Sequence, residues 1–255
     1  MKTLNLSPTN IYSGNLILVN RENPITNREN NYGASLVSVN TEYPDVLLDY
    51  VAAKELSQII NSLDMVNDII PVSGYRTFTE QKRIYADSVT ENGQDFTEKY
   101  VALPNRSEHQ TGLAIDLAEK TAEYDFIRPH FSYTGACLQF RKKAIYYGFI
   151  ERYPKGKEDI TGIAHEPWHF RYVGYPHSEI MDIKNFVLEE YLKYIKNFPY
   201  KGKHLKFFNY EYNYELFYIS LSQLQQNPIK VPADILYQIS GNNMDGFIIT
   251  LRKPR

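Results

Sequence analysis

The chain has 255 residues, and its 28 Lys and Arg against 30 Asp and Glu give a formal net charge of −2. This length can bury a full core, as one domain of typical size with a smaller appendage. Because the charges nearly balance and the basic residues are spread along the chain, the composition does not favour a nucleic-acid partner or an anionic membrane surface.

The cysteine count and the N-terminal residues bear on possible disulfides and on the cellular location. Cys137 is the only cysteine, so an internal disulfide and the cysteine-rich zinc patterns are excluded, and we expect Cys137 to be a buried apolar residue. Residues 1–10 have no apolar core of signal-peptide length, and no stretch approaches the ~20 apolar residues of a membrane span. We therefore expect a cytoplasmic protein, although a secreted protein without its leader would look the same.

Four elements are predicted in the first half of the chain. The short apolar run at 16–19 is typical of a strand. Apolar residues at 47, 48, 51, 52, 56, 59 and 60 predict an amphipathic helix over 45–61. Residues 69–73 predict a second strand, and Thr79 has the character of a cap for a helix that runs to about residue 90.

The second half continues the mixture of helices and strands. Residues 113–117 alternate as a strand does, and 138–147 predicts a helix that ends at Gly148, a favoured C-cap residue. The aromatic and β-branched run at 168–173 predicts another strand, and 185–195 predicts a helix. Helices interspersed with short strands favour an α+β fold over a parallel doubly wound sheet.

The character of the chain changes near residue 199. Residues 207–221 are dense in aromatics, and 234–251 predict two strands around a Gly, Asn and Asp turn. We therefore divide the chain into a main domain, 1–197, and a small β-rich C-terminal extension, 198–255. The composition of the extension assigns it no role.

Two segments, 107–116 and 166–169, carry the residue types of a catalytic zinc site. Gly112 lets the backbone turn inside the first segment, and Glu166 could act as a base from the second. Each residue alone is more often structural, and the helical His-Glu-x-x-His signature is absent. The spacing therefore leaves a metal site and ordinary structural roles both open. The candidate ligands are His109, Asp116 and His169.

These segments resemble the signature of the D-Ala-D-Ala metallopeptidase family of zinc enzymes, which includes the VanX, VanY, VanXY and LdcB types. The resemblance is carried by Ser107-x-His109-x-x-Gly112-x-Ala114-x-Asp116 and Glu166-x-x-His169, and by the segments 15–20, 73–77, 148–154 and 166–174. It covers about residues 15–195 and leaves the C-terminal extension outside. It implies a hedgehog-like D,D-peptidase fold, with a small antiparallel sheet and flanking helices around a zinc cleft.

The resemblance also implies residue roles within the main domain, which would then be the catalytic domain. Glu166 matches the catalytic base, and Arg76 matches an arginine that stabilises the oxyanion or orients the substrate carboxyl group, against the alternative of an exposed turn charge. We expect Ser107 and Gln81 to contact substrate, although Gln81 could instead be a solvent-facing helix residue. The residues that match the ligands of one catalytic Zn²⁺ are His109, Asp116 and His169.

The expected activity follows from this resemblance, which is greatest to the bifunctional VanXY type. We expect a D,D-dipeptidase and D,D-carboxypeptidase whose partners are D-Ala-D-Ala and D-Ala-terminated peptidoglycan precursors, with a role in vancomycin resistance. The alternative enzyme is an LdcB-like L,D-carboxypeptidase that trims tetrapeptides in the cell wall. A non-enzymatic binding module on the same fold is a third possibility. The sequence does not indicate the oligomeric state.

Overall fold

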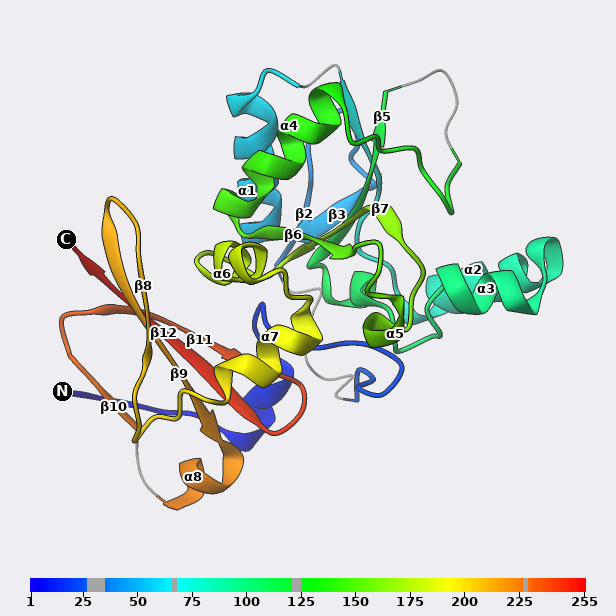
Figure 1. The fold of residues 1–255 in the computed structure, drawn as a ribbon. Coiled ribbons are helices and arrows are strands. Elements are labelled where there is room, and N and C mark those ends of the chain that lie inside the picture. The colour runs from blue at the N-terminus through cyan, green and yellow to red at the C-terminus, as the bar shows by residue number, and fades with distance from the viewer. Residues whose placement is uncertain (27–34, 66–67, 121–124, 227–228) are drawn as a thin grey trace. The chain divides into compact units, whose positions relative to one another are not determined.

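The computed structural model describes residues 1–26, 35–65, 68–120, 125–226 and 229–255. Its contacts divide the chain into two compact units, Val19–Val187 and a second unit made of Met1–Leu18 with Leu188–Arg255. The division differs from the predicted boundary at 197/198. The first 18 residues join the C-terminal extension, since β1 (Lys2–Leu4) pairs antiparallel with β10 (Ile229–Val231) (Figure 1).

The unit Val19–Val187 is built on a four-stranded antiparallel sheet with the order β4-β5-β7-β6. A separate antiparallel pair precedes it in sequence, formed by β2 (Leu36–Ser38) and β3 (Leu47–Asp49). The two central strands of the larger sheet are nearly all buried, as a sheet covered on both faces requires. The four strands are β4 (Ile69–Ser73), β5 (Ala114–Glu119), β6 (Phe149–Tyr153) and β7 (Glu166–Tyr172).

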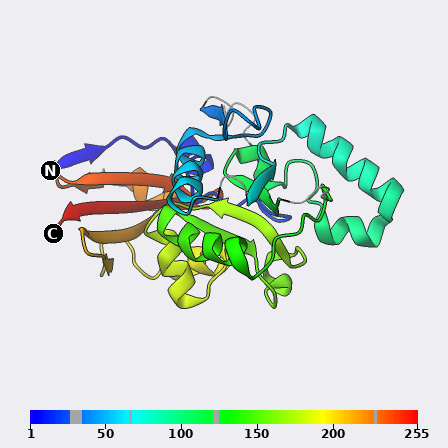
Figure 2. The ribbon, with the colours of Figure 1, turned by 90° about the horizontal axis from the view of Figure 1, so that it is seen from above.

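Helices complete this unit. The helices are α1 (Tyr50–Ser62), α2 (Phe78–Asn92), α3 (Gln94–Tyr100), α4 (Gly135–Ala144), α5 (Glu158–Thr161) and α6 (His177–Lys184), with the 3-10 turns η2 (Glu108–Thr111) and η3 (Ile145–Tyr147). Helices α1 and α4 contact each other, and α2 and α3 form an antiparallel pair (Figure 2). Among the described helices, none is both long and apolar enough to cross a membrane.

An aromatic cluster forms part of the core of this unit. Phe131, Phe140 and Phe170 are fully buried, and their rings meet edge to face with centroids 5.0 to 5.8 Å apart. Such pairs contribute about 0.5–1.5 kcal/mol each beyond the area they bury. Cys137 is buried as predicted. The cluster fixes α4 against β7, the strand that carries Glu166 and His169.

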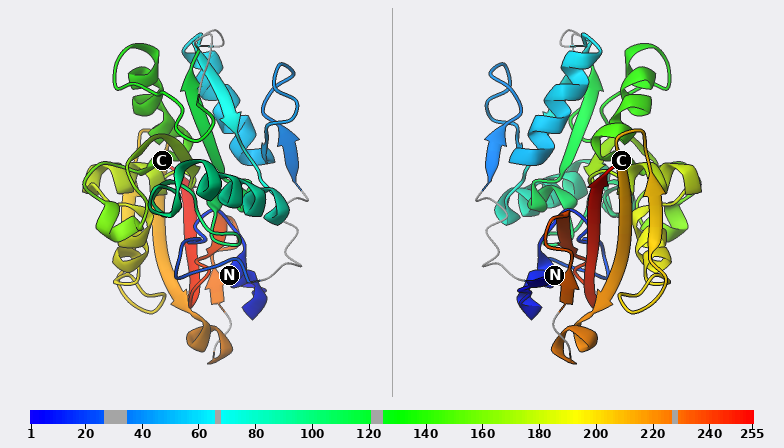
Figure 3. Two further views of the ribbon diagram at one scale, coloured as in Figure 1. Left: turned by 90° about the vertical axis from the view of Figure 1, so that its right-hand side faces the viewer. Right: turned by 90° about the vertical axis from the view of Figure 1, so that its left-hand side faces the viewer.

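The second unit is a four-stranded antiparallel sheet with the order β11-β12-β9-β8, together with the β1–β10 pair (Figure 3). Its strands and helices are β8 (Leu205–Phe208), β9 (Tyr212–Ser220), β11 (Leu236–Gly241), β12 (Gly246–Pro254), η1 (Pro8–Tyr12), α7 (Leu188–Ile195) and α8 (Leu221–Gln226). Its buried core includes Leu4 and Ile11 from the start of the chain beside Phe217 and Phe247. The predicted β-rich character of the extension is confirmed, and so is the α+β class.

Two predicted elements in the first part of the chain differ in the structure. The run 16–19 is buried but is not a strand. Its Leu16 N–H donates to the Ser240 hydroxyl and its Leu18 N–H donates to the Asn242 carbonyl, and these bonds do not form the regular pattern of a β-sheet. The helix predicted from 45 begins at Tyr50, and Asp49 caps it. The apolar residues 47 and 48 belong to strand β3, which directly precedes the helix. Their positions also fit the helical spacing, so the sequence alone does not separate the strand from the helix.

The cap of α2 and the last predicted helix also differ. Thr77, rather than Thr79, caps α2, and its hydroxyl and the Glu80 carboxylate satisfy each other's backbone N–H groups. The helix predicted over 185–195 begins only at Leu188, as α7, because Asn185 adopts a left-handed conformation that caps the preceding helix α6.

Candidate active site

His109 is positioned by a tight turn between α3 and β5. It lies in η2, which ends at Gly112 with φ of +72°. Its Nδ1–H donates to the Gly74 carbonyl at 2.6 Å, because a carbonyl oxygen can only accept. Its Nε2 lies 3.1 Å from Asp116 Oδ2. The bond to Gly74 therefore selects the tautomer in which the Nε2 lone pair is available to a metal.

Asp116 and His169 come from the two central strands. They are direct partners in the antiparallel pairing of β5 with β7, so their side chains share one face of the sheet. Asp116 Oδ1 lies 2.9 Å from His169 Nδ1. Burial alone would lower the pKa of His169, but its contacts with the Asp116 and Glu108 carboxylates raise that pKa to about 9. A cation binding at Nδ1 would thus displace a proton.

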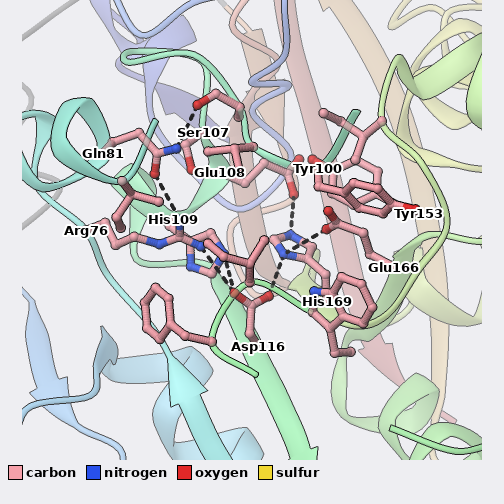
Figure 4. Close-up of a pocket in the computed structure, with 17 residues that line it drawn as sticks. Arg76, Gln81, Tyr100, Ser107, Glu108, His109, Asp116, Tyr153, Glu166 and His169 are labelled. Atoms are coloured by element: carbon pink, nitrogen blue, oxygen red, sulfur yellow. Dashed lines mark hydrogen bonds and ion pairs between the residues drawn. The ribbon is translucent and has the colours of Figure 1, made fainter. Parts of the chain in front are cut away.

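These three side chains form a compact group (Figure 4). Within the described part of the chain, His109, Asp116 and His169 are the one set of His, Cys, Asp or Glu that could hold a metal ion, with one ligand atom of each within 4.8 Å of the others. All three are at least 95% buried. Two imidazoles and one carboxylate match the three-ligand pattern of catalytic zinc sites, which leave a further position for water.

Glu166 begins β7 beside this group. Its Oε2 lies 3.9 Å from His169 Nδ1, and the side chain lines the same pocket as the three candidate ligands. Burial raises the pKa of Glu166 to about 8, against the opposing effect of the charge on His169. A carboxyl group tuned toward neutral pH is suited to accept and return a proton.

Arg76 and Gln81 form a connected pair at the same pocket. The Arg76 guanidinium donates to Asp116 Oδ2 at 3.2 Å and to Gln81 Oε1 at 3.0 Å. The Gln81 amide in turn donates to the Ala102 carbonyl at 2.7 Å, and Gln81 is fully buried rather than solvent-facing. The oxygen and the nitrogen of the Gln81 amide thus both bind protein groups, and Gln81 thereby holds the Arg76 guanidinium in place. Ser107 is buried and lines the pocket.

The pocket that these residues line contains about 490 Å³ of space between atoms, part of which is open to solvent. Its walls combine the polar residues described above with apolar and aromatic residues from several parts of the chain. Those apolar and aromatic residues are Ile84, Tyr100, Val101, Phe126, Ile127, Tyr153, Ile163 and Trp168. The arrangement suits an uncharged small side chain beside a reactive polar group.

Glu108, beside the first candidate ligand, is a site residue that the sequence analysis did not identify. Its Oε1 accepts from Arg152 Nε at 2.8 Å and from Arg171 NH1 at 2.7 Å, and its Oε2 lies 3.6 Å from His169 Nε2. Burial alone would raise the pKa of Glu108, but the two arginines lower it well below its usual range. The sequence did contain a signal for this buried charge cluster, because Arg152 and Arg171 lie within otherwise apolar strands and a buried arginine needs a charged partner. Arg171 also follows His169 by two residues, which places both side chains on one face of the strand.

The fold and a buried group that could hold a metal ion point to a hydrolase, and comparison with known proteins identifies the family. The VanY family model, D-alanyl-D-alanine carboxypeptidase, matches residues 46–175. The bifunctional D-Ala-D-Ala dipeptidase and D-Ala-D-Ala carboxypeptidase VanXYC of Enterococcus gallinarum is 42% identical over 181 residues, which cover 71% of this chain and 94% of that protein. The chain belongs to the VanY family of peptidases, and it is an enzyme rather than a non-catalytic binding module.

Solved structures extend the similarity over the whole chain. The vancomycin-resistance D,D-dipeptidase VanXYg, crystallised with a D-Ala-D-Ala phosphinate analogue, matches with a TM-score of 0.94 and 47% identity, and 99% of each chain is covered. The D,D-pentapeptidase VanY from a VanB-type resistance cassette, crystallised with Zn(II), matches with a TM-score of 0.58 and 30% identity over 70% of this chain and 98% of that one. The predicted D,D-peptidase-like fold is confirmed, and the C-terminal extension is part of the match with VanXYg.

Proposed function

We propose that the chain is a zinc-dependent D,D-peptidase that hydrolyses D-Ala-D-Ala and removes the terminal D-Ala from peptidoglycan precursors. In a cell exposed to vancomycin, this activity would remove the D-Ala-ended precursors and contribute to resistance. The observation that carries the proposal is the convergence of His109, Asp116 and His169 beside Glu166 in one pocket. The similarity to VanXYC and VanXYg supports the choice of substrate.

The donor set fits zinc. His109 offers Nε2 because its other nitrogen is bound to the Gly74 carbonyl, His169 offers Nδ1, and Asp116 offers a carboxylate oxygen. Nitrogen and oxygen donors in this number are what catalytic zinc takes. When bound in such a site, zinc acts as a Lewis acid and lowers the pKa of water. Its assignment here, with these three ligands, is our proposal.

Glu166 would handle the proton during hydrolysis. Its carboxylate takes a proton from the attacking water and returns it to the nitrogen of the departing D-alanine, as a general base that becomes a general acid. The burial that raises the pKa of Glu166 also makes its carboxylate a stronger base than a solvated glutamate. A nearby bound cation would favour its ionised form at the start of the cycle.

Arg76 would stabilise the negative charge that develops on the scissile carbonyl oxygen. Two of its nitrogens bind Asp116 and Gln81, whereas its buried Nε has no hydrogen-bond partner among the residues that the structure describes. A guanidinium group held by these two hydrogen bonds presents its charge to the pocket and need not reorganise during the reaction. Ser107 would contact the substrate from the segment before His109, and Gln81 would act by orienting Arg76.

The D,D-activity is favoured over an L,D-carboxypeptidase by the extent of similarity, since the match with the D,D-dipeptidase VanXYg covers 99% of both chains. Three peptides test the choice: D-Ala-D-Ala, a pentapeptide ending in D-Ala-D-Ala, and a tetrapeptide ending in a single D-Ala. We expect the first two to be hydrolysed. Cleavage confined to the tetrapeptide would contradict the proposal.

A further inference from the structure

Glu108 is a buried carboxylate whose two oxygens have different surroundings. Oε1 accepts from Arg152 and Arg171, and all three side chains are fully buried. Oε2 lies 3.6 Å from His169 Nε2. Within the residues described, neither Oε2 nor Nε2 has a hydrogen-bond partner. A carboxylate held this far inside the protein, with one oxygen left for an imidazole, has more than a packing role.

The chemistry of the two groups fixes where the proton lies. An ionised carboxylate can only accept, so a proton on His169 Nε2 faces Glu108 and a lone pair at that nitrogen would be repelled. The proton that must leave on metal binding is then the one on Nδ1, the nitrogen that lies 2.9 Å from Asp116. Glu108 and Asp116 thus act on opposite sides of the same ring.

We infer that Glu108 is a positioning residue of the metal centre, which holds the His169 ring with its proton on Nε2 and its Nδ1 directed to the metal. Arg152 and Arg171 hold Glu108 in turn. The inference rests on the proposed zinc site. It adds a residue that does not touch substrate but sets the orientation and basicity of a ligand.

A Glu108→Gln variant tests this role with little change of shape. The two arginines can only donate, so the glutamine oxygen would face them and its NH₂ group would face His169 Nε2. That NH₂ group would favour the tautomer with the proton on Nδ1, which opposes metal binding. We expect the zinc dissociation constant, measured by competition with a chelator, to rise about 10–100-fold.

Glu151→Gln is the matched control. Glu151, in strand β6, also pairs with an arginine, the half-buried Arg141 of α4, but its described contacts include none of the candidate ligands. We expect its zinc affinity to stay within about twofold of the wild type, because substitutions away from such contacts usually have small effects. Equal zinc affinity of Glu108→Gln and the wild type would overturn the inference.

A measurement on the wild type keeps the inference testable if Glu108→Gln does not fold. In the zinc-loaded protein, ¹⁵N NMR of the His169 ring should show a proton on Nε2 that is protected from exchange, with Nδ1 bound to metal. A proton on Nδ1 would overturn the inference. Wild-type protein that binds no zinc would overturn the proposed function as well, whereas normal zinc binding with unaltered Glu108→Gln affinity would remove only the role of Glu108.

Discussion

Asp116 and His169 face each other directly across the antiparallel pairing of β5 with β7. The register of two buried strands therefore sets the distance between two of the three candidate ligands. A slip of one residue would turn either side chain to the opposite face of the sheet. The site is thus built on two buried central strands, and the third candidate ligand, His109, lies in the turn that leads into β5.

The Arg76→Ala variant should retain zinc and lose most turnover. Removing a preorganised donor to a developing oxyanion typically costs about 10²–10³ in kcat. The exposed Arg83 on α2 provides a control, because Arg83→Ala removes the same charge outside the pocket. Zinc content and the rate of D-Ala-D-Ala hydrolysis measure the effect. Wild-type turnover in Arg76→Ala would show that Arg76 has no part in the chemistry.

The Glu166→Gln variant should also bind zinc normally, since Glu166 is proposed as the base and not as a ligand. The amide cannot accept the proton of the attacking water, and we expect a loss of about 10²–10⁴ in kcat. Metal analysis beside single-turnover rates separates the two effects. Retained activity would remove the proposed base, and lost zinc would make Glu166 a ligand.

The Gly112→Ala variant should loosen the turn that presents His109. At φ of +72° an added Cβ is strained, and it would meet Leu36 Cδ2 at 2.8 Å and the Asp49 nitrogen at 3.2 Å. Gly156→Ala is the control, because Gly156 has φ of +84° with nothing within 4 Å of the added Cβ.

Left-handed strain alone costs about 1–2 kcal/mol, so Gly156→Ala should lose that much stability and keep its zinc affinity. Gly112→Ala should lose more stability and also bind zinc more weakly. Urea unfolding and chelator competition measure the two quantities. Equal zinc affinity in both variants would mean that the turn does not position His109.

His177, at the start of α6, should make the protein less stable in acid. Burial lowers the pKa of His177 to about 3, whereas the unfolded chain has a pKa near 6.5. The unfolded state therefore takes up a proton first as the pH falls. Stability is complete above about pH 6.5 and declines toward pH 3, by about 2 kcal/mol at pH 5.

Substituting His177 should reduce this acid sensitivity. The free energy of unfolding of the wild type and of His177→Gln, compared at pH 7.5 and pH 5, isolates the contribution, with the exposed His130→Gln as control. We expect the loss between the two pH values to shrink in His177→Gln alone. The same loss in all three proteins would show that His177 titrates normally.

Most of the regular elements could be predicted from the sequence, because their patterns are local. Strand β4 (Ile69–Ser73) was predicted with its observed bounds. The helix predicted over 138–147 is α4 followed by the 3-10 turn η3, which ends at the left-handed Gly148 as predicted. The buried run 16–19 could not be predicted correctly. Its backbone groups bind Ser240 and Asn242, more than 200 residues away, and no local pattern reports that.

The candidate site was only partly predictable for the same reason. The motif spacing and the family resemblance selected His109, Asp116 and His169, which the structure brings together. Glu108 was overlooked because an acidic residue next to a histidine is usually solvated, and its partners Arg152 and Arg171 lie on strands far along the chain. Their convergence depends on the register of β6 and β7, which is a tertiary property.

The central claim is that His109, Asp116 and His169 hold one zinc ion in the pocket shared with Glu166. Anomalous diffraction at the zinc absorption edge, from crystals of the zinc-loaded protein, tests it most directly. We expect a single strong peak within about 2.0–2.2 Å of His109 Nε2, an Asp116 oxygen and His169 Nδ1. A peak elsewhere, or no peak between these three side chains, would contradict it.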